Sequence, residues 1–235
     1  MIKTTLQKYA LPFFSTSLLL LNTPAFSQQK LTADQLFNHD FIGADIAYLE
    51  YFIGPARVTL DNSKEYIVSG CRVHAYMVEG SIRALEMRLS PKCSFDLNAF
   101  LTSDSEAHEP FEANTLKFGD LPSPTTYFSD CFGISCGNAY DPSVYEYYAG
   151  SRVEGFIEIL ASSTQASYEW TSQWAKAMAD KEGEDWMMYG QYNCDPYKYN
   201  RVAEQYRTPD QIERVMVGYD IIQFKGLKQD CITPF

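Results

Sequence analysis

The chain has 235 residues, of which 15% are aromatic and 21% charged, and it carries a net charge of −11 at pH 7. An acid excess of this size opposes binding to nucleic acid and to anionic membrane surfaces. It suits a cationic partner or simple solubility, and we favour solubility. After the first residues, no stretch reaches the length of a transmembrane helix.

Residues 1–27 have the pattern of a secretory signal peptide. The start "MIKTTLQKYA" holds two lysines and no acid, an apolar run follows, and Ala25 and Ser27 occupy the small-residue positions of a cleavage site. The run is short for a membrane anchor, and the cleavage site lacks a cysteine for lipidation. We therefore expect export to the bacterial periplasm or beyond. Without the two lysines, 17 basic residues stand against 30 acidic ones, and the mature chain from Gln28 carries a net charge of −13.

Six cysteines follow the signal segment, and an even number in an exported chain predicts disulfides. Sequence alone does not select the pairing, but spacing along the chain favours three sequential bonds. The expected pairs are Cys71–Cys93, Cys131–Cys136 and Cys194–Cys231.

The stretch "SDCFGISCGNAYDP", residues 129–142, allows three interpretations. A redox pair usually has two residues between its cysteines, whereas four separate Cys131 from Cys136. Asp130, Asn138 and Asp141 could supply oxygen ligands for calcium, but they do not follow the spacing of a calcium-binding loop. We favour a structural staple that closes a tight turn.

The predicted elements begin with a short helix near residue 32, where Thr32 and Gln35 form a capping box. Apolar residues at helical spacing then predict a helix over 44–53, stopped by Gly54-Pro55. The stretch "EYIVSGCRVHAYMVEG" alternates, so we expect one strand over 65–78 that returns as a second strand over 81–90. On this alternation Ile67 shares a face with Cys71 and Val73, whereas Tyr66 lies on the other face with Arg72, His74 and Tyr76.

The motif "YLEYFIGPARV", followed by two antiparallel strands, resembles the small envelope modules of the SmpA/BamE type, whose relatives include the β-lactamase-inhibitor-protein fold. The resemblance covers Leu31 to Leu89 at most. It implies a binding role without catalysis, and no site residue of that family is carried over.

The remaining elements are a short helix or turn at 91–101, an exposed polar connection over 102–125, a strand at 156–160, a helix over 168–182, a strand over 186–193, a short helix over 199–207 and a last strand over 210–222. Together they predict an α+β fold: an antiparallel sheet with helices packed on one face, stapled by disulfides. We expect a single domain over 28–235. The echo between "SIRALEMRL" and "QIERVMVGY" also allows two related α-β-β halves, 28–101 and 126–235, joined by a polar linker.

No catalytic motif was found, and we predict no catalytic residue, no metal and no cofactor. His74 could serve as a base on its strand face or be an ordinary surface or half-buried histidine, local capping explains His39 as well as catalysis does, and His108 is expected in an exposed loop. Acidic residues are too numerous for sequence to select a catalytic pair; they include Asp130, Asp141, Glu146, Glu154, Glu158 and Glu169.

Tyrosines cluster in two segments, "NAYDPSVYEYYAG" and "QYNCDPYKYN", each with an Asp-Pro step and a nearby cysteine. Exposed tyrosines suit protein or glycan recognition, whereas buried ones would cover a modest core. We expect the two segments to be adjacent loops that form a binding surface. Its residues are Tyr140, Tyr145, Tyr147, Tyr148, Tyr192, Tyr197 and Tyr199.

The sequence thus predicts an exported, non-enzymatic binding protein of the periplasm with a protein or glycan partner and neither nucleic acid binding nor membrane insertion. One alternative is an inhibitor or immunity protein against a basic toxin or envelope hydrolase. The other is an enzyme with an unrecognised active site.

Overall fold

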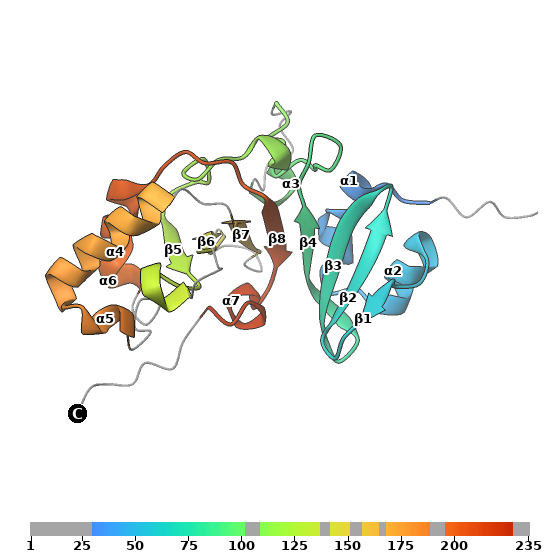
Figure 1. Ribbon diagram of the computed structural model, residues 1–235. Helices are drawn as coiled ribbons and strands as arrows, with labels where there is room; N and C mark the ends of the chain where they lie inside the picture. The colour runs from blue at the N-terminus through green and yellow to red at the C-terminus, as the bar shows by residue number, and fades with distance from the viewer. Residues whose placement is uncertain are drawn as a thin grey trace, which may run out of the picture.

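The structure is a computed structural model and describes residues 30–101, 109–136, 142–150, 157–164, 168–188 and 196–227 (Figure 1). Its centre is one antiparallel sheet in the order β1-β2-β3-β4-β8-β7-β6-β5. Two meanders, β1–β4 and β5–β8, therefore meet along their last strands. The strands are β1 (Val58–Thr59), β2 (Ser63–Val68), β3 (Cys71–Val78), β4 (Ser81–Arg88), β5 (Thr125–Ser129), β6 (Val144–Tyr148), β7 (Glu158–Ser163) and β8 (Arg214–Gly218).

Most of the helices gather at the two ends of the sheet, whereas α3 and α7 lie near its middle, close to β4 and β8 (Figure 1). In the view of that figure, α4, α5 and α6 lie beyond β5, whereas α1 and α2 lie near β1–β3. The α-helices are α1 (Ala33–Leu36), α2 (Ile46–Ile53), α3 (Asn98–Leu101), α4 (Tyr168–Glu182), α5 (Asp185–Met188), α6 (Pro196–Tyr206) and α7 (Ile221–Phe224). Short 3-10 turns are η1 (His39–Phe41), η2 (Ala113–Thr115) and η3 (Gly133–Cys136). The predicted α+β fold with helices against an antiparallel sheet is confirmed.

Local signals positioned the first helices correctly. The Thr32–Gln35 capping box is present at the start of α1. At the start of α2, the Asp45 side chain accepts from the Ala47 N–H, and Gly54 ends the helix with a φ of 86°. Glycine adopts this left-handed conformation without the steric cost of a Cβ atom.

The expected single strand over 65–78 is wrong, because a tight turn divides it into β2 and β3. Ser69 and Gly70 both have positive φ, 52° and 85°, and the ladder closes on the pair Val68–Cys71. A two-residue turn reverses the chain and changes the phase of the alternation. Tyr66 is consequently buried at 2% exposure, whereas Ile67 is 46% exposed, the reverse of the predicted faces.

One face of the sheet forms the main core against α1, α2, α4 and α6, and we name it the helix-covered face. Alternate strand residues such as Val73, Met87 and Val215 point into this core together with Trp170 and Trp174 of α4. Burial of large aromatic side chains from both meanders in one cluster joins the two halves of the sheet.

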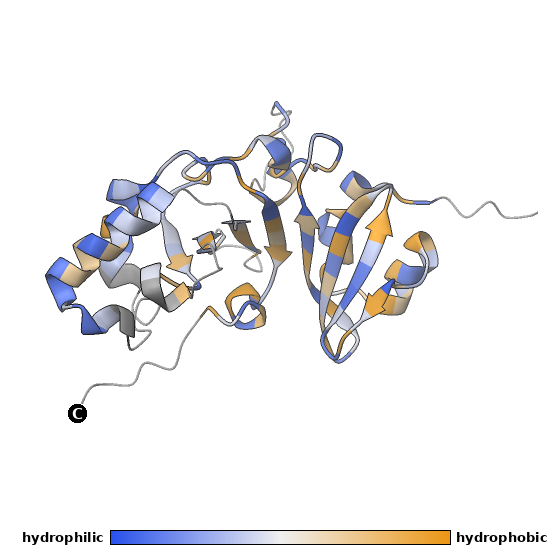
Figure 2. Cartoon of the chain, viewed as in Figure 1, coloured by the Kyte–Doolittle hydropathy of each residue, from blue (hydrophilic) through white to orange (hydrophobic). Residues whose placement is uncertain are grey.

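The opposite face carries a smaller apolar cluster beneath α7, and we name it the α7 face. Buried members of this cluster include Phe128, Leu160 and Met216, with Ile221 from α7 itself. Hydrophilic and hydrophobic residues alternate in bands along β3 (Figure 2), as expected for a strand whose two sides meet different surroundings.

Two further predictions are wrong within the described residues, and two strands were not predicted. The connection over 109–125 is not an exposed linker, because Ala113, Leu116, Phe118 and Leu121 are buried in the main core. The strands β5 and β6 were missed. The predicted strand over 186–193 begins instead as the helix α5, since its apolar run is too short for periodicity to separate the two structures.

Candidate functional site

The predicted tyrosine loops are regular elements. Residues 144–148 form the strand β6, paired with β5 and β7, and residues 196–206 form the helix α6. In β6, buried Val144 and Glu146 alternate with half-buried Tyr145, as is typical of a strand. The preceding Asp-Pro step led to the prediction of a loop instead. Tyr140 and Tyr192 lie outside the described residues, and the side chain of Tyr197 is likewise not described.

The described tyrosines divide between the two faces of the sheet. Tyr145 and Tyr147 pack with the cluster on the α7 face. Tyr148 packs against the main core, and Tyr199 is buried there at 7% exposure beside Trp186. The described tyrosines therefore do not form one exposed surface, because Tyr145 and Tyr147 lie on the α7 face whereas Tyr148 and Tyr199 pack against the main core.

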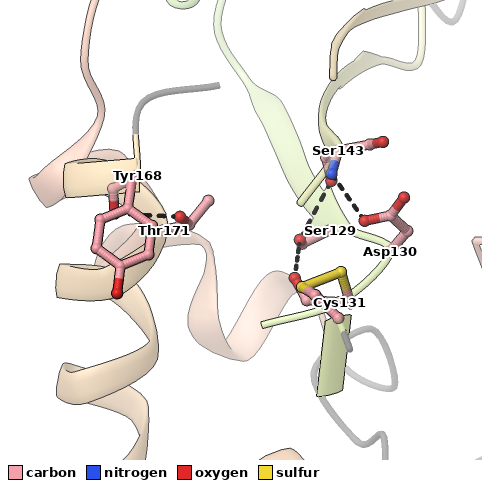
Figure 3. The surroundings of a disulfide bond; sticks show 7 residues. Ser129, Asp130, Cys131, Ser143, Tyr168 and Thr171 are labelled. Atoms are coloured by element: carbon pink, nitrogen blue, oxygen red, sulfur yellow. Dashed lines mark hydrogen bonds between the residues drawn. A yellow bond between two sulfur atoms is a disulfide. The ribbon is translucent and has the colours of Figure 1, made fainter. Parts of the chain in front are cut away.

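The "SDCFGISC" stretch is a stapled turn at the end of β5, as predicted (Figure 3). Cys131 and Cys136 are bonded, and the Asp130 carboxylate accepts the Ser143 N–H at 2.8 Å. The Ser129 hydroxyl donates to the carbonyl oxygens of Cys131 and Ser143. These contacts use the polar groups of the turn to tie β5 to the entry of β6. The second predicted bond, Cys71–Cys93, is also present, whereas Cys194 and Cys231 lie outside the described residues.

A buried glutamate on the α7 face organises the densest charged network of the described sheet. Glu86 of β4 is 2% exposed, and its Oε2 accepts from the Tyr76 hydroxyl and from the Lys225 ammonium, both at 2.7 Å. Lys225, which follows α7, also donates to the Tyr76 hydroxyl at 3.2 Å and lies over the Tyr76 ring. The end of α7 is thereby fastened to the sheet.

The other carboxylate oxygen of this glutamate is less well satisfied. Oε1 of Glu86 accepts no hydrogen bond from the described residues, and the nearest cation, Nη1 of Arg214, is 3.9 Å away. Burial alone would raise the pKa of Glu86, but the Lys225 ammonium, the Tyr76 hydroxyl and Arg214 together hold the pKa below its ordinary value. The site therefore holds a charged carboxylate in a largely dry setting.

His74 stands beside this glutamate in the next strand. It pairs with Glu86 across β3 and β4 and with Glu65 across β2 and β3, and its Nε2 lies 3.5 Å from the Glu65 carboxylate. Burial lowers the pKa of His74 below its ordinary value; Glu86 and Glu65 oppose the shift, whereas Lys225 and Arg214 add to it. His74 is neutral at neutral pH on this basis.

The N-terminal part of the α7 face is open to solvent. Ile67 is 46% and Val58 42% exposed, and the ladders place them in register with Arg72 and Glu65 respectively. The C-terminal part is closed by α7, whose first N–H is accepted by Glu158 and whose preceding Asp220 pairs with Arg83 at 2.8 Å. The face thus combines an open apolar edge with a charged centre.

A second buried carboxylate lies on the helix-covered side and has a structural role. Glu146 accepts from the Gly119 N–H at 2.8 Å and from the Tyr127 hydroxyl at 3.0 Å, and Arg207 donates to that hydroxyl at 2.6 Å. Burial raises the pKa of Glu146 and, with the Glu146 charge, raises the pKa of Tyr127 to about 12. Every group in this cluster has a partner, so it clamps the 117–121 loop to β5 and β6.

A groove of about 670 Å³ lies beside the Cys71–Cys93 bond, between α1 and residues 91–99. Its acids serve the backbone: Asp96 accepts the N–H groups of Asn98 and Phe111, and Glu112 accepts the Ser94 hydroxyl. We therefore place the candidate site on the α7 face and not in this groove.

Among the described residues, no cluster of three or more histidine, cysteine or acidic side chains could hold a metal ion. In the same part of the chain, no helix combines the length and apolar character needed to cross a bilayer. Comparisons of the chain with family models, with curated proteins and with solved structures found no match. The resemblance to the SmpA/BamE type therefore stays a prediction.

Sequence reasoning placed His74, Arg72 and Tyr76 on one strand face, and the structure bears this grouping out. It missed the roles of Glu86 and Lys225, which lie 139 residues apart. The one available signal was Glu86 itself, an acid that interrupts the apolar run from Ala84 to Met87.

Proposed function

We propose that the protein is an exported, non-catalytic binding protein that contacts its partner through the open part of the α7 face. The observation that carries the proposal is the exposure of Val58 and Ile67 beside exposed Arg72 on a sheet face that the helices leave uncovered. The side of a sheet that faces solvent ordinarily carries polar side chains. Large apolar side chains exposed on that side therefore indicate a contact surface.

Export is supported by the signal pattern of residues 1–27 and by two disulfides, which persist in oxidising compartments. The partner class remains a protein or a glycan of the envelope. An inhibitor of a basic toxin would be expected to present carboxylates, whereas this face presents Arg72, Arg88 and Arg214 at or near the surface. We therefore favour general binding over inhibition.

The charged centre favours binding over catalysis. A general base needs a free acceptor within reach of a substrate. One oxygen of Glu86 is engaged by Tyr76 and Lys225, and the other is buried. The network therefore stabilises the sheet and the position of α7.

The test compares two changes to exposed apolar residues. The double variant Val58→Ser/Ile67→Ser removes the apolar edge without adding charge, and Tyr168→Ser alters the 77% exposed ring on α4 as a matched control. Immobilised mature protein is exposed to envelope extract, and captured species are identified by mass spectrometry. We expect a partner retained by the wild type and by Tyr168→Ser and lost by the double variant. Equal capture by all three proteins would refute the proposed surface.

The proposed export is tested separately, by the position of the mature N-terminus. The mature protein should begin at Gln28, which intact-mass analysis of secreted material reads directly. An unprocessed Met1 would contradict export by this signal.

A further inference from the structure

Three arginines lie side by side across the middle of the sheet. Arg88 of β4 pairs directly with Arg214 of β8, and the β3–β4 ladder, continued one residue beyond Val73–Met87, places Arg72 next to Arg88. Neighbouring strands lie about 5 Å apart, so the three Cα atoms span only about 10 Å. We name Arg72, Arg88 and Arg214 the arginine row.

All three side chains project from the α7 face. Each alternates with a residue buried in the main core, namely Val73, Met87 and Val215. Arg72 and Arg88 are exposed, and the Arg214 side chain is 41% exposed. The row is therefore open to a ligand in solution.

This arrangement does not serve folding. Like charges directly opposite each other in neighbouring strands destabilise a sheet. Arg88 has no ion-pair partner in the described part of the chain, and the contacts of Arg72 with Glu65, at 3.7 Å, and of Arg214 with Glu86, at 3.9 Å, are longer than hydrogen bonds. The buried Nε of Arg214 also lacks an acceptor among the described residues. The exposed guanidinium groups of Arg72 and Arg88, and the exposed part of the Arg214 guanidinium, are thus left available to a ligand, whereas the Arg214 Nε is not.

The local charge balance is positive in an otherwise acidic protein. The arginine row and Lys225 contribute four positive charges, and Glu65 and Glu86 contribute two negative ones. A neutral His74 leaves a surplus of two positive charges, whereas the chain as a whole carries −11. A bound dianion would neutralise the surplus.

We propose that the arginine row binds a phosphate group, carried by a small soluble molecule or by the partner assigned to this face, and this inference rests on the proposed function. Guanidinium groups donate bidentately to phosphate oxygens, and the surplus of two positive charges matches a phosphate dianion better than a singly charged carboxylate. The acidic remainder of the chain repels extended polyanions, which disfavours nucleic acid and anionic bilayers.

The Cys71–Cys93 disulfide holds the row in place. Cys71 immediately precedes Arg72, and Cys93 lies in a bridge with Ser90, two residues after Arg88. The bond therefore fixes the ends of β3 and β4 where their arginines project, and a preorganised site loses less entropy on binding.

Isothermal titration calorimetry with inorganic phosphate and glucose 6-phosphate, at constant ionic strength, tests the site. Arg88→Gln removes the unpaired member, and Arg201→Gln, an exposed arginine on α6, is the matched control. We expect saturable binding that Arg88→Gln weakens at least tenfold and Arg201→Gln leaves unchanged. No saturable binding, or equal losses in both variants, would overturn the inference.

A sedimentation experiment with lipid vesicles distinguishes a soluble phosphate ligand from the phosphate headgroup of a lipid. Phosphatidylcholine vesicles with and without phosphatidic acid are sedimented with the protein. We expect no binding to either, and binding to phosphatidic acid without binding to the soluble phosphates would overturn the proposal in favour of a lipid. If the wild type captures a partner but binds no phosphate, this inference alone is rejected. If the wild type and the Val58→Ser/Ile67→Ser variant capture partners equally well, the proposed function is rejected.

Discussion

The ammonium of Lys225 donates to Oε2 of Glu86 at 2.7 Å and so joins the residue after α7 to the centre of β4. Glu86 is almost fully buried, and the Lys225 side chain is 17% exposed. The pair closes α7 over the apolar cluster of the C-terminal strands. It also separates the closed part of the α7 face from the open part that carries the proposed site.

Removing one member of this pair should destabilise the fold strongly. Lys225→Met leaves a buried carboxylate without its main counter-charge, and we expect a loss on the order of 3 kcal/mol in the free energy of unfolding. The double variant Lys225→Met/Glu86→Gln should lose less, because it leaves no buried charge. Urea denaturation measures both, and a double variant less stable than Lys225→Met would contradict the assignment.

The two observed disulfides should differ in their contribution to stability. Cys71–Cys93 joins positions 22 residues apart, and Cys131–Cys136 joins positions 5 apart. In the chain-entropy model the first bond contributes about 3 kcal/mol and the second about 2 kcal/mol. Thermal unfolding of the Cys71→Ala/Cys93→Ala and Cys131→Ala/Cys136→Ala variants compares them. Greater destabilisation by loss of the short-range bond would show that the turn at η3 has a role beyond loop closure.

Gly218 occupies a position where no other residue fits. Its φ is 147°, and an added Cβ would lie 2.2 Å from the Arg83 carbonyl oxygen and 2.5 Å from the Ala84 Cα. Because these are backbone atoms of the paired strand β4, Gly218→Ala should cost about 3 kcal/mol or more. Gly70→Ala, at φ 85° with open space around the added atom, isolates the conformational strain and should cost about 1 kcal/mol. Equal losses in chemical denaturation would refute the close approach of β4 and β8.

The pH dependence of stability should report the burial of neutral His74. Its folded pKa lies below the unfolded value of about 6.5, so the unfolded chain binds the proton more readily. As far as His74 is concerned, the free energy of unfolding is therefore constant above about pH 6.5. It falls as the pH drops below that value, because protonation of His74 then favours the unfolded chain. Burial of the imidazole is the main cause of the lowered pKa; Glu86 and Glu65 oppose it, whereas Lys225 and Arg214 add to it.

The variant His74→Gln isolates this effect. The difference in the free energy of unfolding between wild type and variant should be constant above neutral pH and should shrink or reverse in mildly acidic buffer. A difference that grows in favour of the wild type on acidification would indicate a raised pKa and contradict the assignment.

Local sequence patterns were sufficient where a short-range rule decides the structure. The capping box at Thr32, the stop at Gly54 and the end of α4 before Gly183 depend on residues within one turn of a helix. The pairs Cys71–Cys93 and Cys131–Cys136 followed from proximity along the chain. The sequence by itself also determined the α+β class, because amphipathic helices and alternating strands each require a partner surface.

Tertiary structure decided the features that bring distant residues together. The turn at Ser69-Gly70 changed the face of Ile67, since side-chain direction in a strand depends on where the turn falls. The sequence pattern placed Arg72 on a strand face with His74 and Tyr76 but did not relate it to Arg88 or Arg214. The three arginines form a row because β4 and β8 pair in one register out of many, and that register is set by the burial of Leu85, Met87, Val215 and Val217 in the common core. No local pattern encodes that pairing, because the free energy that selects it comes from the core of the whole sheet.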